Sequence, residues 1–309
     1  MGLAVVLGTG LVGLLTVVLV LAVLAVVAMA TGGTGLLDLP DDAWFVTPWG
    51  MLATNLLLAA GIPVAMLAVR VGHRWRPGYV SSVVGRLRWR VLLGSAARAA
   101  LVLVPALLVT VVVDAAFTGT LGDLTAFDPE PRWAALALVV LLTTPLQAAG
   151  EEYFFRGWLT QAIGSWCARP LVALVLPALV SATVFALAHG SQDPWLFADR
   201  FAFGLVASVL VWRTGGLEAS IAVHTVNNVA AFALAIAYGG LADSLAATEA
   251  APWVVVLDVL AFAGAAFLAA RWATRSGVRR EVPGGWVGRA GRASPRTPDH
   301  QTTTGGRTP

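Results

Sequence analysis

The sequence predicts an all-α integral membrane protein with about eight transmembrane helices. Of its 309 residues, 58% are apolar and only 12% are charged, whereas a soluble domain carries roughly a quarter charged residues. The mean hydropathy is +0.80, and the apolar residues come in runs of about 20, the length that a helix needs to cross a bilayer. This composition excludes an ordinary soluble enzyme and also a disordered chain, which would be polar.

Eight apolar segments stand out along the chain. We expect transmembrane helices at residues 3–30, 49–69, 91–116, 133–158, 171–189, 201–212, 217–238 and 253–272. The sixth segment is short for a bilayer, so we expect it to be extended at its ends or buried by its neighbours. No strand-like alternation competes with these runs, and no internal repeat is visible.

The charges of the loops alternate along the chain. Residues 31–48 carry three Asp and no Arg, whereas residues 70–90 carry six Arg. The loop at 117–132 is acidic again, with three carboxylates to one Arg, and the stretch after the last span is rich in Arg. Basic loops remain in the cytoplasm. An arrangement of about eight spans with both termini in the cytoplasm therefore places every basic loop inside the cell and every acidic loop outside.

These boundaries divide the chain into four regions. Residues 1–130 form the N-terminal transmembrane helices, with a basic cytoplasmic loop at 70–90. Residues 131–240 form a core that contains the polar motifs, and residues 241–273 contain the last transmembrane helix. Residues 274–309 are rich in Gly, Arg, Thr and Pro, so we expect a disordered cytoplasmic tail.

The basic residues indicate a lipid partner. All 20 of them are Arg, against 17 acidic residues, and the pI is near 9.7. Anionic lipid is the expected partner, and not nucleic acid, because no basic patch is interleaved with aromatic residues. Residues 72–90 form either an interfacial helix on the membrane surface or a plain positively charged anchor. The single cysteine, Cys167, excludes an intramolecular disulfide and a cysteine-rich metal site.

The first polar motif, Glu-Glu-x-x-x-Arg, lies in the fourth span. Charged side chains inside a membrane are costly, which makes them functional candidates. Glu151 and Glu152 point about 100° apart around a helix and cannot share one face. Glu152 and Arg156 are four residues apart and can pair, which leaves Glu151 to face something else. The alternative interpretation is a group of charges at the inner membrane boundary.

Two further motifs place imidazole and amide groups in later spans. Phe185 and His189 share a helix face, and so do His224 and Asn228, with Asn227 beside them. Taken singly, the first His suits a helix boundary and the Asn pair suits hydrogen bonding between helices. Taken together, the motifs supply a general base, two imidazoles and an amide donor. That set is what the hydrolysis of an amide needs.

The three motifs, in this order and on separate hydrophobic spans, resemble those of the CAAX-protease and bacteriocin-processing (CPBP, Abi-type) family of intramembrane endopeptidases. The resemblance covers about residues 131–238. It implies that Glu151, assisted by His189, activates the attacking water, and that His224 and Asn228 stabilise the oxyanion. The supporting residues are then Glu152, Arg156, Phe185 and Asn227.

The donor set permits a metal without requiring one. Two His and one Glu fit a zinc site with an open coordination position. If Zn²⁺ is bound, its ligands are His189 and His224, because His73 and His300 lie in the basic loop and in the tail. The His-Glu-x-x-His pattern of soluble zinc proteases does not occur.

The depth of the motifs sets a further constraint. If the fourth span begins at Trp133, Glu151 falls near its inner boundary, while His189 falls near the outer end of the next span. At a rise of 1.5 Å per residue, the two would be roughly 20 Å apart. We therefore expect the fourth span to begin beyond Leu136, with residues 164–170 inside the cytoplasm, which raises Glu151 towards the midplane.

The sequence thus predicts an intramembrane endopeptidase, glutamate-type or metal-assisted, acting on a membrane-bound peptide or protein. The Arg-only, Ala- and Gly-rich composition is typical of a GC-rich bacterial genome, so we expect the bacterial inner membrane. One alternative is a proton-coupled transporter with Glu151, His189, His224 and Asp258 as its relay. Another is a non-catalytic membrane scaffold or immunity protein on the same fold. Outside the motifs, Asp258 and Asn55 fit hydrogen-bonded residues that face the bundle.

Overall fold

The computed structural model of the chain describes residues 46–125 and 127–282. Within these residues, the regular secondary structure is helical apart from one isolated antiparallel bridge between Ser82 and Gly216. Seven helical segments in the described part are long and apolar enough to cross a membrane. The all-α, polytopic membrane fold is therefore confirmed. The expected span at 3–30, and with it the side on which the N-terminus lies, falls outside the described residues, as does the chain beyond residue 282.

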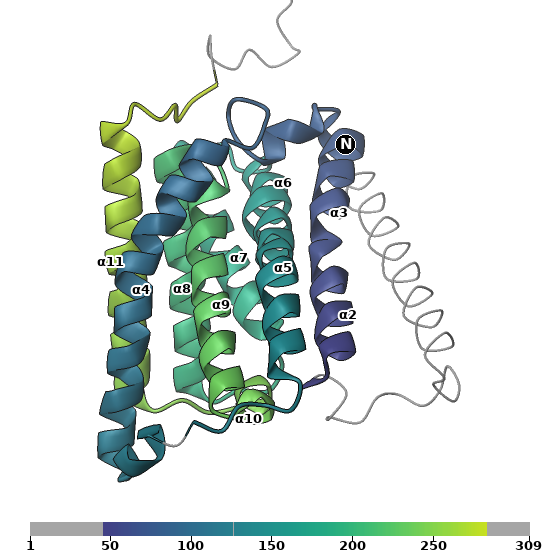
Figure 1. The fold of residues 1–309 in the computed structure, drawn as a ribbon. Helices are drawn as coiled ribbons and strands as arrows, with labels where there is room; N and C mark the ends of the chain where they lie inside the picture. Colours follow the sequence, from purple (N-terminus) through teal and green to yellow (C-terminus); the bar gives the residue numbers. More distant parts are fainter. Residues whose placement is uncertain (1–45, 126, 283–309) are drawn as a thin grey trace, which may run out of the picture.

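The helices follow the expected order (Figure 1). The spans are Pro48–His73 (α2 Pro48–Ala59, α3 Gly61–Ala68, η2 Val69–His73), α4 (Trp89–Thr118), Trp133–Gly164 (α5 Trp133–Glu152, η5 Tyr153–Leu159, α6 Thr160–Gly164), α7 (Pro170–Leu187), α8 (Pro194–Thr214), α9 (Glu218–Ala237) and α11 (Pro252–Arg275). Short helices between them are η3 (Pro77–Val80), η4 (Leu121–Thr125) and α10 (Leu241–Ala246).

The short sixth segment is extended at both ends, as its length requires. Helix α8 begins at Pro194, and the side chain of Asp193 caps it by accepting the backbone N–H of Leu196 at 2.8 Å. It ends at Thr214, where Gly215 adopts a left-handed conformation with φ of 67° that terminates the helix. The resulting 21 residues give a helix of roughly 30 Å, enough to cross a bilayer.

Helix α9 lies at the centre of the bundle. It packs against α4, α5, α8 and α11, while α2 covers the other side of α5 and α7 packs against α8. Figure 1 shows α4 and α11 at one edge of the bundle and α2 with α3 at the other. The helix that carries the His-x-x-x-Asn motif is therefore surrounded by other helices and not by lipid alone.

The basic loop folds back onto the bundle and does not form an interfacial helix. Between the π-helical end of the first described span at His73 and the start of α4 at Trp89, the one helical turn is Pro77–Val80. Val80 is 2% exposed, and the backbone N–H of Val83 donates to the carbonyl of Gly215 at 3.0 Å. The interfacial-helix interpretation is wrong because the loop uses apolar residues to pack against protein and not against lipid.

The first described span crosses the fourth closely beside the acidic motif. The amide of Asn55 donates to the hydroxyls of Thr143 at 2.8 Å and Thr144 at 3.2 Å, so it is a hydrogen-bonded residue facing the bundle, as expected. Close by, Gly61 and Gly150 meet backbone to backbone, and a Cβ on either would clash with the opposing main chain. Glycine is required at this crossing because no side chain fits between the helices.

The crossing gives a first prediction. In Gly150→Ala, the new methyl meets the carbonyl of Leu58, which cannot move without separating α2 from α5. We expect a loss of about 1–3 kcal/mol of stability, typical of overpacking, measured by thermal unfolding in detergent. The matched control is Gly264→Ala in α11, where the nearest atom, of Val102, lies at 3.4 Å. Equal melting temperatures for the two variants would contradict this account of the crossing.

Candidate active site

The acidic motif lies in the interior of an unusually long helix. Trp133–Gly164 contains 32 residues, which span roughly 48 Å and exceed the hydrocarbon thickness of about 30 Å. The helix begins at Trp133 and continues beyond Glu151 to Gly164, so both of its ends can lie outside the hydrocarbon. A span that begins beyond Leu136, with Glu151 raised towards the midplane, stays a prediction. Directly after Glu152 the hydrogen-bond ladder becomes π-helical over Tyr153–Leu159, a local widening that is frequent at functional sites.

The three motifs come together around the ring of Phe185. Its centroid lies 4.8 Å from that of His189 and 5.9 Å from that of His224. The same ring is 5.3 Å from Phe155, inside the acidic motif. Spans four, five and seven therefore converge at one level of the bundle.

The Glu152–Arg156 pair is completely buried. The two side chains are 2.9 Å apart and both 0% exposed, in the i,i+4 arrangement that the spacing predicts. The guanidinium carbon lies 4.2 Å from the centroid of the Phe185 ring, a cation–π contact. Gly204 on α8 leaves the space that the guanidinium occupies, because a Cβ there would lie 3.2 Å from Nη2. The pair is thus fixed by charge, by an aromatic face and by shape.

Both glutamates contact the same imidazole, which the sequence analysis did not foresee. His224 Nδ1 lies 3.0 Å from Glu152 Oε1, and Nε2 lies 3.3 Å from Glu151 Oε2. A carboxylate can only accept, so Nδ1 donates to Glu152, which fixes the orientation of the ring. The two carboxylates differ in access: the side chain of Glu151 is 13% exposed and that of Glu152 is 0% exposed. Glu151 is the one that can meet water or substrate.

His189 is held by a backbone carbonyl just beyond the end of α7. Its Nδ1 donates to the carbonyl of Phe185 at 2.8 Å, which leaves Nε2 with a lone pair when the ring is neutral. Burial lowers the pKa of His189, against the opposing effects of that carbonyl and of the Glu151 carboxylate. A neutral imidazole near Glu151 is suited to take part in proton transfer.

The amide of Asn228 meets a residue that the sequence analysis missed. Its Nδ2 donates to Gln147 Oε1 at 3.2 Å, and Asn227 donates to Asn228 Oδ1 at 3.4 Å. Gln147 lies four residues before Glu151, on the same helix face. The four-residue spacing between Gln147 and Glu151 is the feature of the sequence that could have identified Gln147 as a site residue. One face of α5 therefore presents Gln147 and Glu151 to the face of α9 that presents Asn228 and His224.

Several polar atoms at the site make no hydrogen bond to other described residues, although Glu151 Oε2 lies 3.3 Å from His224 Nε2. Glu151 Oε2, Glu152 Oε2, Arg156 Nε, Arg156 Nη2 and Thr225 Oγ1 are buried and make no hydrogen bond within the described part of the chain. An unpaired buried polar group costs free energy, and ordered water is its usual partner. Polar atoms gathered at one level of an apolar bundle therefore form an environment that attracts water, the co-substrate of any hydrolysis.

The donors at this level do not fit a zinc centre with three protein ligands. Among residues 46–125 and 127–282, no three His, Cys, Asp or Glu side chains come together in a way that could hold a metal ion. The ring of His224 is also engaged on both sides, by Glu152 at Nδ1 and by Glu151 at Nε2. His189 and His224 as the ligands of a bound Zn²⁺ therefore stay a prediction that this arrangement does not support.

Asp258, the fourth residue of the transporter alternative, lies apart from the three motifs. It is on α11, and no ion pair or hydrogen bond joins it to Glu151, His189 or His224 among the described residues.

The buried pair gives a second prediction. Arg156→Ala leaves Glu152 without its partner, which for a buried pair costs roughly 3–5 kcal/mol. The double change Glu152→Gln with Arg156→Gln should cost less, because no orphan charge remains. Thermal unfolding in detergent measures both, with Arg213→Ala, an exposed arginine on α8, as control. If the losses of stability in the single variants Glu152→Gln and Arg156→Gln simply add up to the loss in the double variant, the two residues are not coupled.

Residues 132–230 match the family described as Rce1-like, type II CAAX prenyl endopeptidase Rce1-like. A curated relative, "Uncharacterized protein YyaK" of Bacillus subtilis (strain 168), is 30% identical over 145 residues, which make up 44% of this chain and 48% of the relative. The chain thus spans about half the length of the relative that it matches. No solved structure matches it significantly.

All three polar motifs lie inside the matched segment. The segment runs from the beginning of α5 to the middle of α9 and so includes every helix that meets around Phe185. Together with the seven apolar helices, the match confirms the predicted likeness: this is a multi-pass membrane protein whose residues 132–230 are similar to type II CAAX prenyl endopeptidases of the Rce1-like family.

Proposed function

We propose that the protein is an intramembrane endopeptidase that hydrolyses peptide bonds of membrane-associated peptides or proteins. The observation that carries the proposal is the imidazole of His224 held between Glu151 and Glu152, all three on membrane-spanning helices. A carboxylate that meets an imidazole and is accessible on one side is the arrangement expected of a general base. The likeness of residues 132–230 to a family of endopeptidases supports the same conclusion.

In this proposal Glu151 takes a proton from water, and the resulting hydroxide attacks the carbonyl carbon of the scissile peptide bond. His189, whose Nε2 is not used by the Phe185 carbonyl, assists this proton transfer. The proton is then delivered to the leaving nitrogen as the C–N bond breaks, so that water is divided between the two products. The acid and base steps each need a group within hydrogen-bond reach of the substrate, and these two residues supply them.

His224 and Asn228 are proposed to stabilise the oxyanion of the tetrahedral intermediate. Both lie on one face of α9, and each is oriented from α5, the imidazole by Glu152 and the amide by Gln147. Donors fixed before the reaction stabilise developing charge without reorganisation, which is why such groups contribute strongly to catalysis. Glu152, Arg156 and Phe185 support these donors without touching the substrate.

The substrate is proposed to be anchored in the membrane, because the candidate residues lie on helices long enough to cross it. The description of the matched family is that of a CAAX prenyl endopeptidase. For a chain with this composition we propose a bacterial inner-membrane location, with a membrane protein, signal peptide or bacteriocin-like peptide as substrate. The Arg-rich end of the bundle would contact anionic lipid.

The proposed base gives a third prediction. Glu151→Gln replaces a carboxylate by an amide of nearly equal volume, so it should lower the turnover of a fluorogenic membrane peptide by about 10²–10⁴-fold. Expression and melting temperature should stay unchanged. Glu249→Gln, an exposed carboxylate outside the bundle, is the matched control. Wild-type turnover in the purified Glu151→Gln variant would remove this residue from the role of base.

The proposed oxyanion donor gives a fourth prediction. Asn228→Ala should lower kcat by about 10²–10³-fold, the usual effect of removing one such donor. Gln147→Ala should have a smaller effect, because it removes the group that orients the amide and not the amide itself. Steady-state kinetics in proteoliposomes measure both. A Gln147→Ala effect larger than that of Asn228→Ala would mean that Gln147 itself contacts the substrate.

A further inference from the structure

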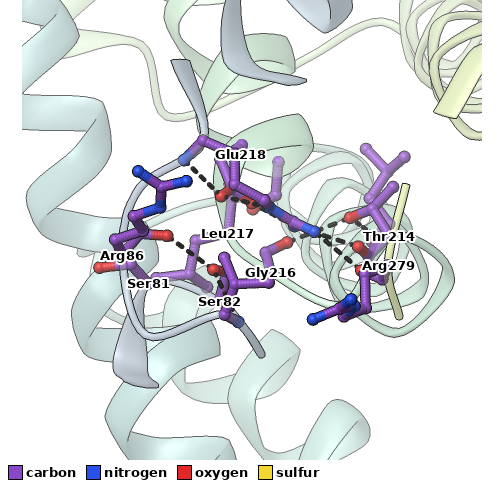
Figure 2. Close-up of polar contacts among 12 residues, drawn as sticks. Ser81, Ser82, Arg86, Thr214, Gly216, Leu217, Glu218 and Arg279 are labelled. Atoms are coloured by element: carbon purple, nitrogen blue, oxygen red, sulfur yellow. Dashed lines mark hydrogen bonds and ion pairs between the residues drawn. The ribbon is translucent and has the colours of Figure 1, made fainter. Parts of the chain in front are cut away.

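The loop formed by residues 81–88 contacts the helix of the acidic motif and α9, which carry three of the four catalytic candidates. It precedes α4 at the Arg-rich end of the bundle, at the top of Figure 1. Figure 2 shows it against the turn that joins α8 to α9. The proposed reaction does not use any residue of this loop, yet two of them, Ser81 and Ser82, are buried and hydrogen-bonded.

Arg88 joins the loop to the first residue of α9. Its Nε and Nη2 donate to the two carboxylate oxygens of Glu218 at 2.8 and 2.7 Å, and its backbone N–H donates to Glu218 Oε1 at 2.9 Å. Its Nη1 donates to the carbonyl of Arg279 at 2.8 Å, and its Nη2 also reaches that of Thr214 at 3.1 Å. The side chain of Glu218 is 0% exposed. A two-point ion pair with a fully buried carboxylate fixes orientation as well as distance.

Ser81 joins the same loop to the acidic motif. Its hydroxyl lies 2.7 Å from the phenol oxygen of Tyr153, the residue that directly follows Glu152. Its carbonyl accepts the backbone N–H of Leu217 at 2.9 Å, immediately before α9. One short segment is therefore hydrogen-bonded to the helix of the acidic motif and to the start of α9.

The turn before α9 has no room to shift against the loop. Gly216 is bridged to Ser82, and a Cβ on Gly216 would clash with the side chains of Glu218, Arg88 and Ser82 at once. The close approach of the glycine backbone brings the carboxylate and the guanidinium together. Any displacement of the loop must therefore move the first turn of α9.

That first turn is close to the reaction centre along the chain. His224 follows Glu218 by six residues, which is less than two helical turns. Because a helix is stiff over this distance, rotation or translation at its first residue is transmitted to the imidazole. The two glutamates that contact His224 are linked to the same loop as well, because Tyr153, which follows Glu152, hydrogen-bonds to Ser81.

We propose that Arg88 is a positioning residue: by holding the 81–88 loop against Glu218, it fixes the register of α9 against α5 and thereby the contact of His224 with the two glutamates. The consequence for turnover rests on the endopeptidase function proposed above, whereas the consequence for helix register does not. The two can therefore be measured separately.

Helix register is measured by cross-linking. Cysteines are introduced as Gln147→Cys on α5 and Asn228→Cys on α9, whose native side chains hydrogen-bond across the helices, in a Cys167→Ser background. A short bifunctional methanethiosulfonate is added to membranes, and the cross-linked fraction is followed over time. Adding Arg88→Met, which removes every guanidinium contact, should abolish most of the cross-linked product. The same result is expected for Arg88→Lys, which keeps the charge but cannot bond both carboxylate oxygens and two carbonyls.

A second variant and two controls separate geometry from charge. Gly216→Ala displaces the Arg88–Glu218 pair sterically without changing any charge, so it should lose cross-linking as Arg88→Met does. Arg90→Met removes an exposed positive charge two residues further on, and Gly240→Ala adds a methyl where no atom lies within 4 Å. Both controls should cross-link at the rate of the parent protein.

Turnover is then measured with Gln147 and Asn228 restored. Arg88→Met and Gly216→Ala should lower kcat by about 10²-fold, the cost of misplacing a reacting group by about 1 Å, while KM stays nearly unchanged. A general loss of folded protein would instead reduce the active fraction without changing the pH profile or KM of the remainder. For that reason kcat is expressed per active site after titration with a tight-binding inhibitor, or per folded protein from size-exclusion.

The outcomes are distinct. Parent-like cross-linking in Arg88→Met, Arg88→Lys and Gly216→Ala overturns the proposal, whether or not the protein cleaves peptides. If these variants do not accumulate, Glu218→Gln, which keeps the side-chain volume but removes the ion pair with Arg88, decides the matter: cross-linking equal to that of the parent overturns the proposal, and reduced cross-linking supports it. A parent protein that cross-links but cleaves no membrane peptide contradicts the proposed function and leaves the result on register standing.

Discussion

The imidazole of His224 lies between two adjacent glutamates of another helix, and the rest of the site is arranged around this contact. Consecutive helical residues point about 100° apart, so Glu151 and Glu152 can meet one group only if it lies between their directions and carries polar atoms on two sides. A ring with two nitrogens satisfies that condition. The contact forms at one rotation and one register of α5 against α9, which makes the packing of these helices part of the chemistry.

The buried charges explain why so much of the surrounding packing is specific. An ionised group inside a membrane protein is tolerated when it is paired and hydrogen-bonded. Arg156 meets this need for Glu152, and the aromatic face of Phe185 and the missing side chain of Gly204 hold the guanidinium in place. The close backbone crossing at Gly150 fixes the helix one residue before the acidic pair. Stability and site geometry therefore depend on the same few residues.

Contacts within one helix could be predicted from the sequence, and contacts between helices could not. The spans follow from hydropathy, and the Glu152–Arg156 pair follows from i,i+4 spacing. That both glutamates reach His224 depends on how α5 is rotated towards α9, which no spacing within either helix encodes. Gln147 was detectable only as a polar residue one turn before Glu151. The apolar residues of the 72–90 loop suit lipid and protein surfaces equally, so their pattern could not tell the two apart.

A single proton links the two roles proposed for the acidic pair and the imidazole. Glu151, Glu152 and Arg156 together carry one net negative charge when all are ionised, and a proton on His224 makes the group of four neutral. Apolar surroundings favour such a balance, because unbalanced charge there is costly. In that state Glu151 keeps its carboxylate for water, while the Nε2–H of His224, which faces Glu151 Oε2 at 3.3 Å in this structure, would have to turn to the oxyanion. If the proton lay on Glu151 instead, Glu151 would no longer be a base and His224 would no longer have a second N–H to donate. Glu152 accepts from Nδ1 and fixes the orientation of the ring, so a carboxylate that makes no bond to the substrate determines how the imidazole faces it.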